Sequence, residues 1–346
     1  MVSLALAIGA SGLSAMLITP LFIRILRRHG IGEEIREDGP ERHVSKRGTP
    51  TMGGVVIVIS SLLGYSVAHL PFRRTVPISW PAILCYFVVV SMGALGVADD
   101  WSKARQIRKT GLSKSTKFLG QIAIASVFAG GAMHIGAPTT ASFITGGIEL
   151  GALFVPFALL VIAASSNSVN LTDGLDGLAA GAAGLVYAAY MFISFWQFNQ
   201  RATDLYPATK ALDAQLDMAI FAGSMFAACI GFLWWNAAPA KIFMGDAGAL
   251  ALGGGIAASA MMTSTPLLLP ILGGLFVLET ISVIVQVIAF RLFKRRVFLM
   301  APVHHHFELK GWPEFTVIVR FWIISGLFVG LGLAIFYGDF LIRSGL

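Results

Sequence analysis

Apolar residues in this chain form long runs that are separated by short polar connections. Ten runs approach the roughly 20 residues that a helix needs to cross a bilayer, and they lie at 4–23, 52–71, 78–98, 118–137, 150–169, 178–198, 218–238, 247–264, 267–290 and 316–340. The eighth run is rich in Gly and Ala, but the Thr-Ser-Thr-Pro segment at 263–266 separates it from the ninth. The pattern predicts an all-α integral membrane protein with ten transmembrane helices, in a single domain over residues 1–346.

Composition supports this class and excludes a soluble protein. Of the 346 residues, 56% are hydrophobic and 12% are charged, whereas charged residues make up about 25% of an average soluble domain. Glu279 is the only formal charge between Asp246 and Arg291. Cys85 and Cys229 both lie inside apolar runs, so we expect neither a disulfide framework nor a cysteine metal site.

The basic residues predict how the chain is oriented in the membrane. Connections that follow odd-numbered runs hold 20 of the 25 Lys and Arg residues, and cytoplasmic connections carry such an excess. Both termini should therefore lie on the extracytoplasmic side. The first run has no cleavage site and precedes Arg24, Arg27 and Arg28, which indicates an uncleaved helix. Because topology accounts for the net charge of +7, we do not expect nucleic-acid binding.

Most of the candidate functional residues also lie in connections that follow odd-numbered runs. They are Asp99 and Asp100 after the third run, Asp173 and Asp176 after the fifth, Asp246 after the seventh, and His304, His305 and His306 after the ninth. A purely structural bundle does not need this convergence. We therefore expect an active site on the cytoplasmic face.

Asp99 and Asp100 could simply be the polar end of a transmembrane helix. Adjacent carboxylates repel each other, however, and a divalent cation between them or protonation of one relieves the repulsion. Lys103, one turn later, could neutralise them or bind a phosphate. We expect Lys103 and Lys117, which belong to the same basic connection, to bind substrate.

The fifth run ends in small and amide residues that lead to Asn170, Asp173 and Asp176. Two carboxylates three positions apart would lie one helical turn apart and could share a ligand. One of them could instead cap the next helix. Polar side chains at this depth are costly, which favours a functional site.

Four further features have both a functional and a structural interpretation. In the loop from Asn236 to Asp246, Phe243 could stack on a base or lie at the membrane interface. The histidine tract could bind a transition metal, but consecutive helical residues point apart, so we favour phosphate contact or positioning. Lys46 precedes a Gly-rich helix start that could bind an anion, or it could serve topology alone. Glu279 is either functional or paired with a neighbouring helix.

Together these residues point to a polyanionic ligand. Carboxylates repel such a ligand unless a cation intervenes, and oxygen ligands without cysteine favour Mg²⁺ or Mn²⁺ over zinc. An oxygen-ligated metal and basic loops at a bilayer surface favour phosphoryl transfer to or from a lipid.

Five motifs together resemble the phospho-N-acetylmuramoyl-pentapeptide transferases, within the polyprenyl-phosphate hexosamine-1-phosphate transferase superfamily. They are Lys-Arg-Gly-Thr-Pro-Thr-Met-Gly-Gly at 46–54, Asp-Asp at 99–100, Asn-Leu-Thr-Asp-Gly-Leu-Asp-Gly-Leu at 170–178, Asn-Ala-Ala-Pro-Ala-Lys-Ile-Phe-Met-Gly-Asp at 236–246 and Ala-Pro-Val-His-His-His-Phe-Glu at 301–308. Their order and spread over nearly the whole chain make the resemblance specific.

The resemblance implies transfer of phospho-MurNAc-pentapeptide from UDP-MurNAc-pentapeptide to undecaprenyl phosphate, which gives lipid I and UMP with Mg²⁺ as cofactor. It also implies ten helices, a homodimer and the bacterial inner membrane. The implied roles are a Mg²⁺ ligand for Asp246, action near the lipid phosphate for Asp99 and Asp100, a pocket lined by Asn170, Asp173 and Asp176, nucleotide contact by Lys46, Asn236 and Phe243, and phosphate contact by His304, His305 and His306.

The sequence departs from the family pattern at one place. We expect Thr-Gly-Ser after Asp246, but the chain has Ala247, Gly248 and Ala249, so any role for those hydroxyls is in doubt. Two alternatives stay open. A related transferase would move GlcNAc-1-phosphate to the same lipid, whereas a secondary transporter would place its polar residues at the bilayer midplane.

Overall fold

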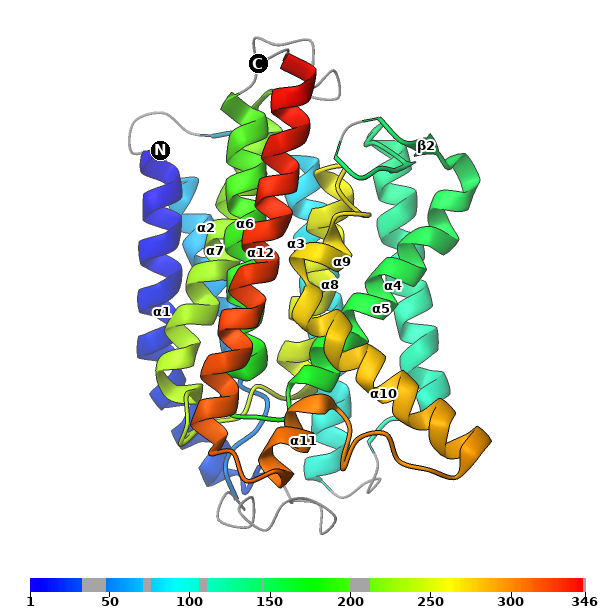
Figure 1. Cartoon of the computed structure of the whole chain (residues 1–346). Helices are drawn as coiled ribbons and strands as arrows, with labels where there is room; N and C mark the ends of the chain where they lie inside the picture. Colours follow the sequence, from blue (N-terminus) through cyan, green and yellow to red (C-terminus); the bar gives the residue numbers. More distant parts are fainter. Residues whose placement is uncertain (33–47, 71–75, 106–110, 145, 200–211, 345–346) are drawn as a thin grey trace.

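The computed structural model is a bundle of long helices that run between two ends of the molecule (Figure 1). It describes residues 1–32, 48–70, 76–105, 111–144, 146–199 and 212–344. The long helices are α1 (Val2–Arg28), α2 (Gly54–Ala68), α3 (Trp80–Ala104), α4 (Lys114–His134), α5 (Phe154–Thr172), α6 (Leu178–Asn199), α7 (Leu212–Asn236), α8 (Gly245–Met262), α10 (Gly274–Phe293) and α12 (Glu314–Ser344).

Both termini lie at the same end of the bundle, at the top of Figure 1. A small hairpin of β1 (Thr140–Ala141) and β2 (Ile148–Glu149) lies at that end, paired antiparallel with Thr140 opposite Glu149. The short helix α11 (Val303–Leu309) lies at the opposite end (Figure 1). The hairpin corrects the prediction of a wholly helical chain. It forms where the polar segment between α4 and α5 turns through Gly146 and Gly147, both with positive φ.

Within the described residues, eight helices are long and apolar enough to cross a membrane, and α1, α4, α10 and α12 carry large apolar side chains on exposed surfaces. Length and hydropathy do not give the ten spans that the pattern predicts. Helix α2 has only 15 residues, and α8 is not among the eight. Helix α8 is enclosed by protein, since all its residues from Asp246 to Met262 are buried. It therefore does not need the long aliphatic side chains that favour contact with lipid.

Small residues let α8 pack closely against its neighbours. A Cβ atom added to Gly54 of α2 would lie 2.0 Å from Gly248, and one added to Gly96 of α3 would lie 2.2 Å from the carbonyl oxygen of Asp246. Such stripes of Gly and Ala allow close approach of helix backbones. The Ala and Gly residues after Asp246 thus fix the start of α8 against α2 and α3, beside the end of α3 that bears the acidic pair.

The ninth apolar run is divided in the structure. A single turn, α9 (Leu269–Leu272), precedes α10, and the division falls at Gly273 and Gly274. A Cβ atom on Gly274 would lie 2.4 Å from the ring of Phe328, so α12 packs directly on this point. Helix α10 then leans away from the bundle (Figure 1), which leaves room for α11 beneath it.

Candidate active site

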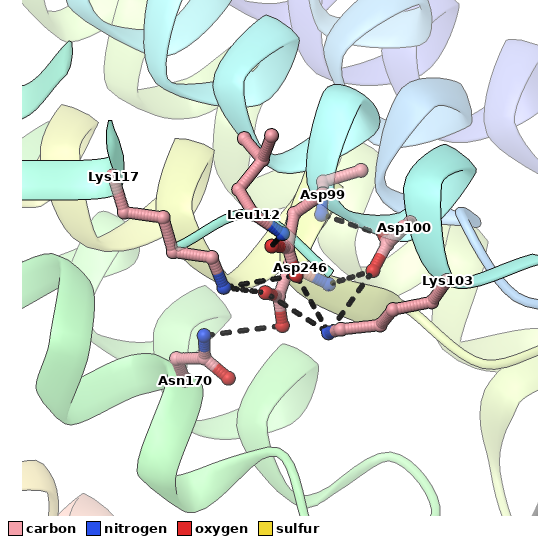
Figure 2. Close-up of polar contacts among 8 residues, drawn as sticks. Asp99, Asp100, Lys103, Leu112, Lys117, Asn170 and Asp246 are labelled. Carbon is pink, nitrogen blue, oxygen red and sulfur yellow. Dashed lines mark hydrogen bonds and ion pairs between the residues drawn. The ribbon is translucent and has the colours of Figure 1, made fainter. Parts of the chain in front are cut away.

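Three carboxylates from two helices meet at one end of the bundle. Asp99 and Asp100 belong to the last turns of α3, and Asp246 is in the first turn of α8. One oxygen from each lies within 4.8 Å of the others. All three residues are buried, with Asp99 fully so. Figure 2 shows them grouped around a common centre.

Two lysines bind this group. Lys103 places Nζ 2.7 Å from Oδ2 of Asp99 and 3.3 Å from Oδ2 of Asp246. Lys117, from the start of α4, places Nζ 2.9 Å and 2.7 Å from the same two oxygens. The structure therefore brings both predicted lysines to the acidic cluster, as counter-charges for carboxylates that would otherwise repel each other.

Backbone amides fix two of the carboxylates. Asp100 accepts hydrogen bonds from the amides of Asp246 at 3.2 Å and Ala247 at 3.0 Å. These amides are at the positive end of the α8 dipole, which favours a bound anion. Asp99 accepts from the amide of Leu112 at 2.7 Å. Gly111 precedes Leu112 with φ +72°, and a Cβ atom there would lie 2.6 Å from the Asp99 carboxylate.

Of the residues predicted after the fifth run, Asn170 contacts the cluster. Its Nδ2 donates to Oδ1 of Asp246 at 3.1 Å (Figure 2). The expectation that Asp173 and Asp176 lie on one helical turn was wrong. Helix α5 ends at Thr172 and α6 begins at Leu178, so both aspartates lie in the connecting turn. The Asn-Leu-Thr-Asp-Gly-Leu-Asp-Gly sequence has two glycines there, which end the helix.

Asp176 and Asn236 hold the loop that leads to Asp246. Oδ2 of Asp176 accepts from the amide of Ala240 at 2.9 Å, and Nδ2 of Asn236 donates to the carbonyl of Ile242 at 2.9 Å. Phe243 is half-buried, and its backbone pairs with residues of the segment before α2, donating to Pro50 and accepting from Gly53. These contacts define the position of Asp246.

The three histidines point to three different partners, as expected for consecutive residues on a helix. His304 is fully buried and places Nδ1 3.1 Å from Oε2 of Glu279. His305 contacts Oε2 of Glu308 at 2.7 Å, and His306 accepts from the amide of Leu299 at 3.1 Å. Glu279 thus has a partner from α11, which agrees with the pairing alternative.

The acidic cluster fits a small divalent cation. Its ligands are carboxylate oxygens, the type that Mg²⁺ prefers, and they converge from buried positions. In the described ranges, no other group of three or more His, Cys, Asp or Glu side chains has this convergence. The histidine tract is not part of it. Lys46 lies outside the described residues.

Sequence reasoning missed the polar residues of α10 that bind the segment before α11. Ser282 accepts from the amide of Val303 at 3.0 Å, and Gln286 accepts from the amides of Val297 and Phe298, both at 3.0 Å. With Glu279 they are spaced i, i+3, i+7, the pattern of one helix face. That spacing within an apolar run could have identified them.

Known proteins match this chain over nearly its full length. The sequence model of Glycosyl transferase family 4 matches residues 80–264, and phospho-N-acetylmuramoyl-pentapeptide-transferase signature 1 matches residues 46–58. A phospho-N-acetylmuramoyl-pentapeptide-transferase of Frankia casuarinae is 49% identical, with 96% of each chain covered. The protein with the same name from Frankia alni is 49% identical, and the match covers 94% of this chain and 95% of that relative. The one from Mycobacteroides abscessus is 45% identical, with 98% of each chain covered.

Proposed function

The chain belongs to the phospho-N-acetylmuramoyl-pentapeptide-transferase family, and from this premise we propose its reaction in detail. The protein transfers phospho-MurNAc-pentapeptide from UDP-MurNAc-pentapeptide to undecaprenyl phosphate, releasing UMP and forming lipid I for peptidoglycan synthesis. The observation that carries this proposal is the buried cluster of Asp99, Asp100 and Asp246, at the places where the family motifs predict a phosphate-transfer site.

We propose that the protein lies in the bacterial inner membrane as one ten-span domain. The eight apolar helices would be joined by α2 and by the protein-enclosed α8. Support comes from the two termini, which lie at one end of the bundle as an even number of spans requires (Figure 1). The excess of Lys and Arg in alternate connections favours a cytoplasmic site. A homodimer stays a prediction.

Mg²⁺ is the proposed cofactor, with Asp246 as its principal ligand and Asp99 and Asp100 within reach. When bound, it would supply positive charge to the diphosphate of the donor and to the leaving UMP. Without a bound cation, the buried carboxylates would repel the polyanionic donor, because like charges repel. The amides of α8 hold the Asp100 carboxylate in place, and Asn170 holds that of Asp246.

The residues of the chain chiefly provide position and charge. A phosphate monoester has a second pKa of about 6 and is mostly dianionic at neutral pH, so removal of its proton by Asp99 would gain little. Lys103 and Lys117 lie beside Asp99 and Asp246, where their ammonium groups can neutralise phosphate charge during direct attack by the lipid phosphate. One phosphoanhydride bond is broken and one is formed, so the reaction is reversible.

The donor would occupy the surface around the cluster. We assign Asn170, Asp173 and Asp176 to its pocket, Asn236, Phe243 and Lys46 to the nucleotide part, and His304, His305 and His306 to the phosphates. For Asp176 and Asn236 the hydrogen bonds to Ala240 and Ile242 support an indirect role, since both hold the 237–244 loop beside the cluster.

The proposal is tested with purified protein in proteoliposomes that contain undecaprenyl phosphate. With UDP-MurNAc-pentapeptide and Mg²⁺, mass spectrometry should detect lipid I, and UMP should appear in equal amount. With UDP-GlcNAc no lipid product should form. A GlcNAc lipid product would support the related transferase, and uptake of the nucleotide substrate without UMP release would support a transporter.

A further inference from the structure

Glu279 is an acidic residue in the interior of an otherwise apolar helix. It belongs to α10 and is completely buried. A carboxylate in such a place is costly unless a partner compensates it. The burial of this carboxylate therefore requires a compensating partner.

The partner is His304. Its Nδ1 lies 3.1 Å from Oε2 of Glu279, and His304 is also fully buried. Within the part of the chain that the structure describes, the Glu279 carboxylate and the His304 ring have no hydrogen-bond partner, so this ion-pair contact is the polar contact that the two side chains share. The carboxylate therefore acts on His304, which belongs to the family's histidine motif.

Nδ1 is the ring nitrogen of His304 that faces the carboxylate, at 3.1 Å. A carboxylate oxygen accepts hydrogen bonds, so this approach favours the form of the ring that bears hydrogen on Nδ1. The hydrogen bond at one nitrogen of an imidazole fixes the state of the other, as in the aspartate-histidine pair of serine proteases. Nε2 is left to accept a proton, or to donate a hydrogen bond when the ring is charged.

Nε2 faces the turn between α5 and α6. A Cβ atom added to Gly174 would lie 2.4 Å from Nε2 of His304 and 3.2 Å from Nε2 of His305. Gly174 directly follows Asp173, and the same segment contains Asn170, which contacts Asp246. Glycine at 174 thus leaves space for both imidazole rings beside the turn that leads to the acidic cluster.

The charge of Glu279 is not needed to attach α11 to α10. Ser282 accepts from the amide of Val303, and Gln286 binds the backbone at Val297 and Phe298. Three neutral hydrogen bonds therefore already hold the segment that leads into α11. A merely structural Glu279 would duplicate this attachment at the cost of a buried charge.

We propose that Glu279 is a positioning residue for the transfer reaction. It holds His304 through Nδ1 and thereby places Nε2 against the α5–α6 turn at Gly174, so that the buried ring supports the turn that follows Asn170. The catalytic part of this inference rests on the proposed function, whereas the state of the imidazole does not.

The kinetic test compares Glu279→Gln, which keeps the shape of the side chain, with Thr280→Val. Thr280 is the matched control because it is the next residue of α10 and its substitution removes a part-buried hydrogen bond to Ser168 instead. Glu279→Gln should lower kcat by about 10- to 100-fold with KM for the donor nearly unchanged, and Glu279→Asp should restore part of the rate. Thr280→Val should retain the wild-type kcat. Wild-type kcat in a folded Glu279→Gln protein would overturn the proposal.

A double-mutant cycle separates action through His304 from an independent structural effect. Because Glu279 acts through the ring, Glu279→Gln should cost little further activity in a His304→Gln background. Equal fold-losses in both backgrounds would contradict the proposal. Thermal unfolding of every variant in detergent identifies any that fails to fold.

The tautomer is measured without substrate, by ¹⁵N NMR of protein labelled in its histidine rings. The His304 signals are those that disappear in His304→Gln. Wild-type protein should carry hydrogen on Nδ1, and Glu279→Gln should shift this state. Hydrogen on Nε2 alone in the wild type, or no change in Glu279→Gln, would refute the positioning role. If the wild type shows the expected state but releases no UMP, the proposed function fails and the Glu279–His304 relationship stands.

Discussion

Lys117 and Asp246 form an ion pair across the active-site end of the bundle, with Nζ 2.7 Å from Oδ2. The lysine lies in the first turn of α4 and the aspartate in the first turn of α8, and the same ammonium group lies 2.9 Å from Asp99 of α3. One side chain therefore joins three helices and offsets the charge of two buried carboxylates. The same position suits an ammonium group that binds a phosphate during transfer.

Replacing Lys117 with Met should lower kcat by about 100-fold, because the side-chain length is kept while the charge that faces the phosphates is lost. Lys103 remains beside the same carboxylates, so the variant should fold. The matched control is Lys114→Met, an exposed lysine one turn earlier in α4. UMP release under saturating substrate measures both. Equal rates for the two variants would remove Lys117 from the site.

Replacing Asp246 with Asn should nearly abolish turnover and weaken the dependence of the rate on Mg²⁺, since the amide keeps the shape but loses the charge that binds a cation. Titration of Mn²⁺ by electron paramagnetic resonance gives the affinity directly. Glu149→Gln, in the hairpin at the opposite end, is the control for loss of one acidic charge. Wild-type metal affinity in Asp246→Asn would show that Asp246 is not a ligand.

Replacing Asp99 with Asn should lower kcat with little change in KM for the UDP substrate, because the acceptor phosphate is its proposed neighbour. A single-turnover experiment without undecaprenyl phosphate tests the alternative role of a covalent nucleophile. Direct attack by the lipid phosphate predicts no UMP in that experiment. A stoichiometric burst of UMP that Asp99→Asn loses would establish a covalent intermediate instead.

At the opposite end of α2, His69 and Asp217 provide a test of stability against pH. Nε2 of His69 lies 2.9 Å from the buried carboxylate of Asp217, and Nδ1 lies 2.7 Å from the carbonyl oxygen of Tyr65. Burial lowers the pKa of His69, but the hydrogen bonds to Asp217 and Tyr65 and the charge of Asp217 raise it more, so the pKa lies above its usual 6.5.

A raised folded-state pKa means that the protonated form stabilises the fold. This contribution is fully present below the unfolded pKa of about 6.5 and is lost as pH rises through the folded value. The Tm in detergent should therefore fall more steeply above neutral pH in the wild type than in His69→Gln. His134→Gln, at an exposed histidine, should keep the wild-type slope. Parallel slopes for wild type and His69→Gln would exclude this linkage.

Much of the architecture could be predicted from the periodic features of the sequence. Each of the ten apolar runs contains a long helix, because run length and polar boundaries are local properties. Parity of the connections indicated that Asp99, Asp100, Asp173, Asp176, Asp246 and the histidine tract would converge. Of these, Asp99, Asp100 and Asp246 form the cluster, and Asn170 contacts it. Helix α8 gave the weakest hydrophobic run because it is rich in Gly and Ala. These residues allow close contact with other helices, and such contacts cannot be predicted from a short stretch of sequence.

What could not be predicted depends on tertiary contacts between distant segments. The sequence left Glu279 with no named partner, since only the approach of α11 to α10 brings His304 to it. Asp173 and Asp176 were predicted to lie on one helical turn, whereas α5 ends at Thr172 and both residues lie in the glycine-containing turn before α6. The cluster formed by His69, Asp217 and Tyr65 was not anticipated, because its members come from separate elements and match no motif.

The most direct test of the proposed reaction is UMP release by the purified wild-type protein when donor, lipid acceptor and Mg²⁺ are each omitted in turn. Direct transfer predicts UMP and lipid I in equal amounts when all three are present. It predicts neither product when any one is omitted or when EDTA is added. No UMP from the complete mixture, or full UMP release without undecaprenyl phosphate, would contradict direct transfer from the nucleotide to the lipid at the Asp99, Asp100 and Asp246 cluster.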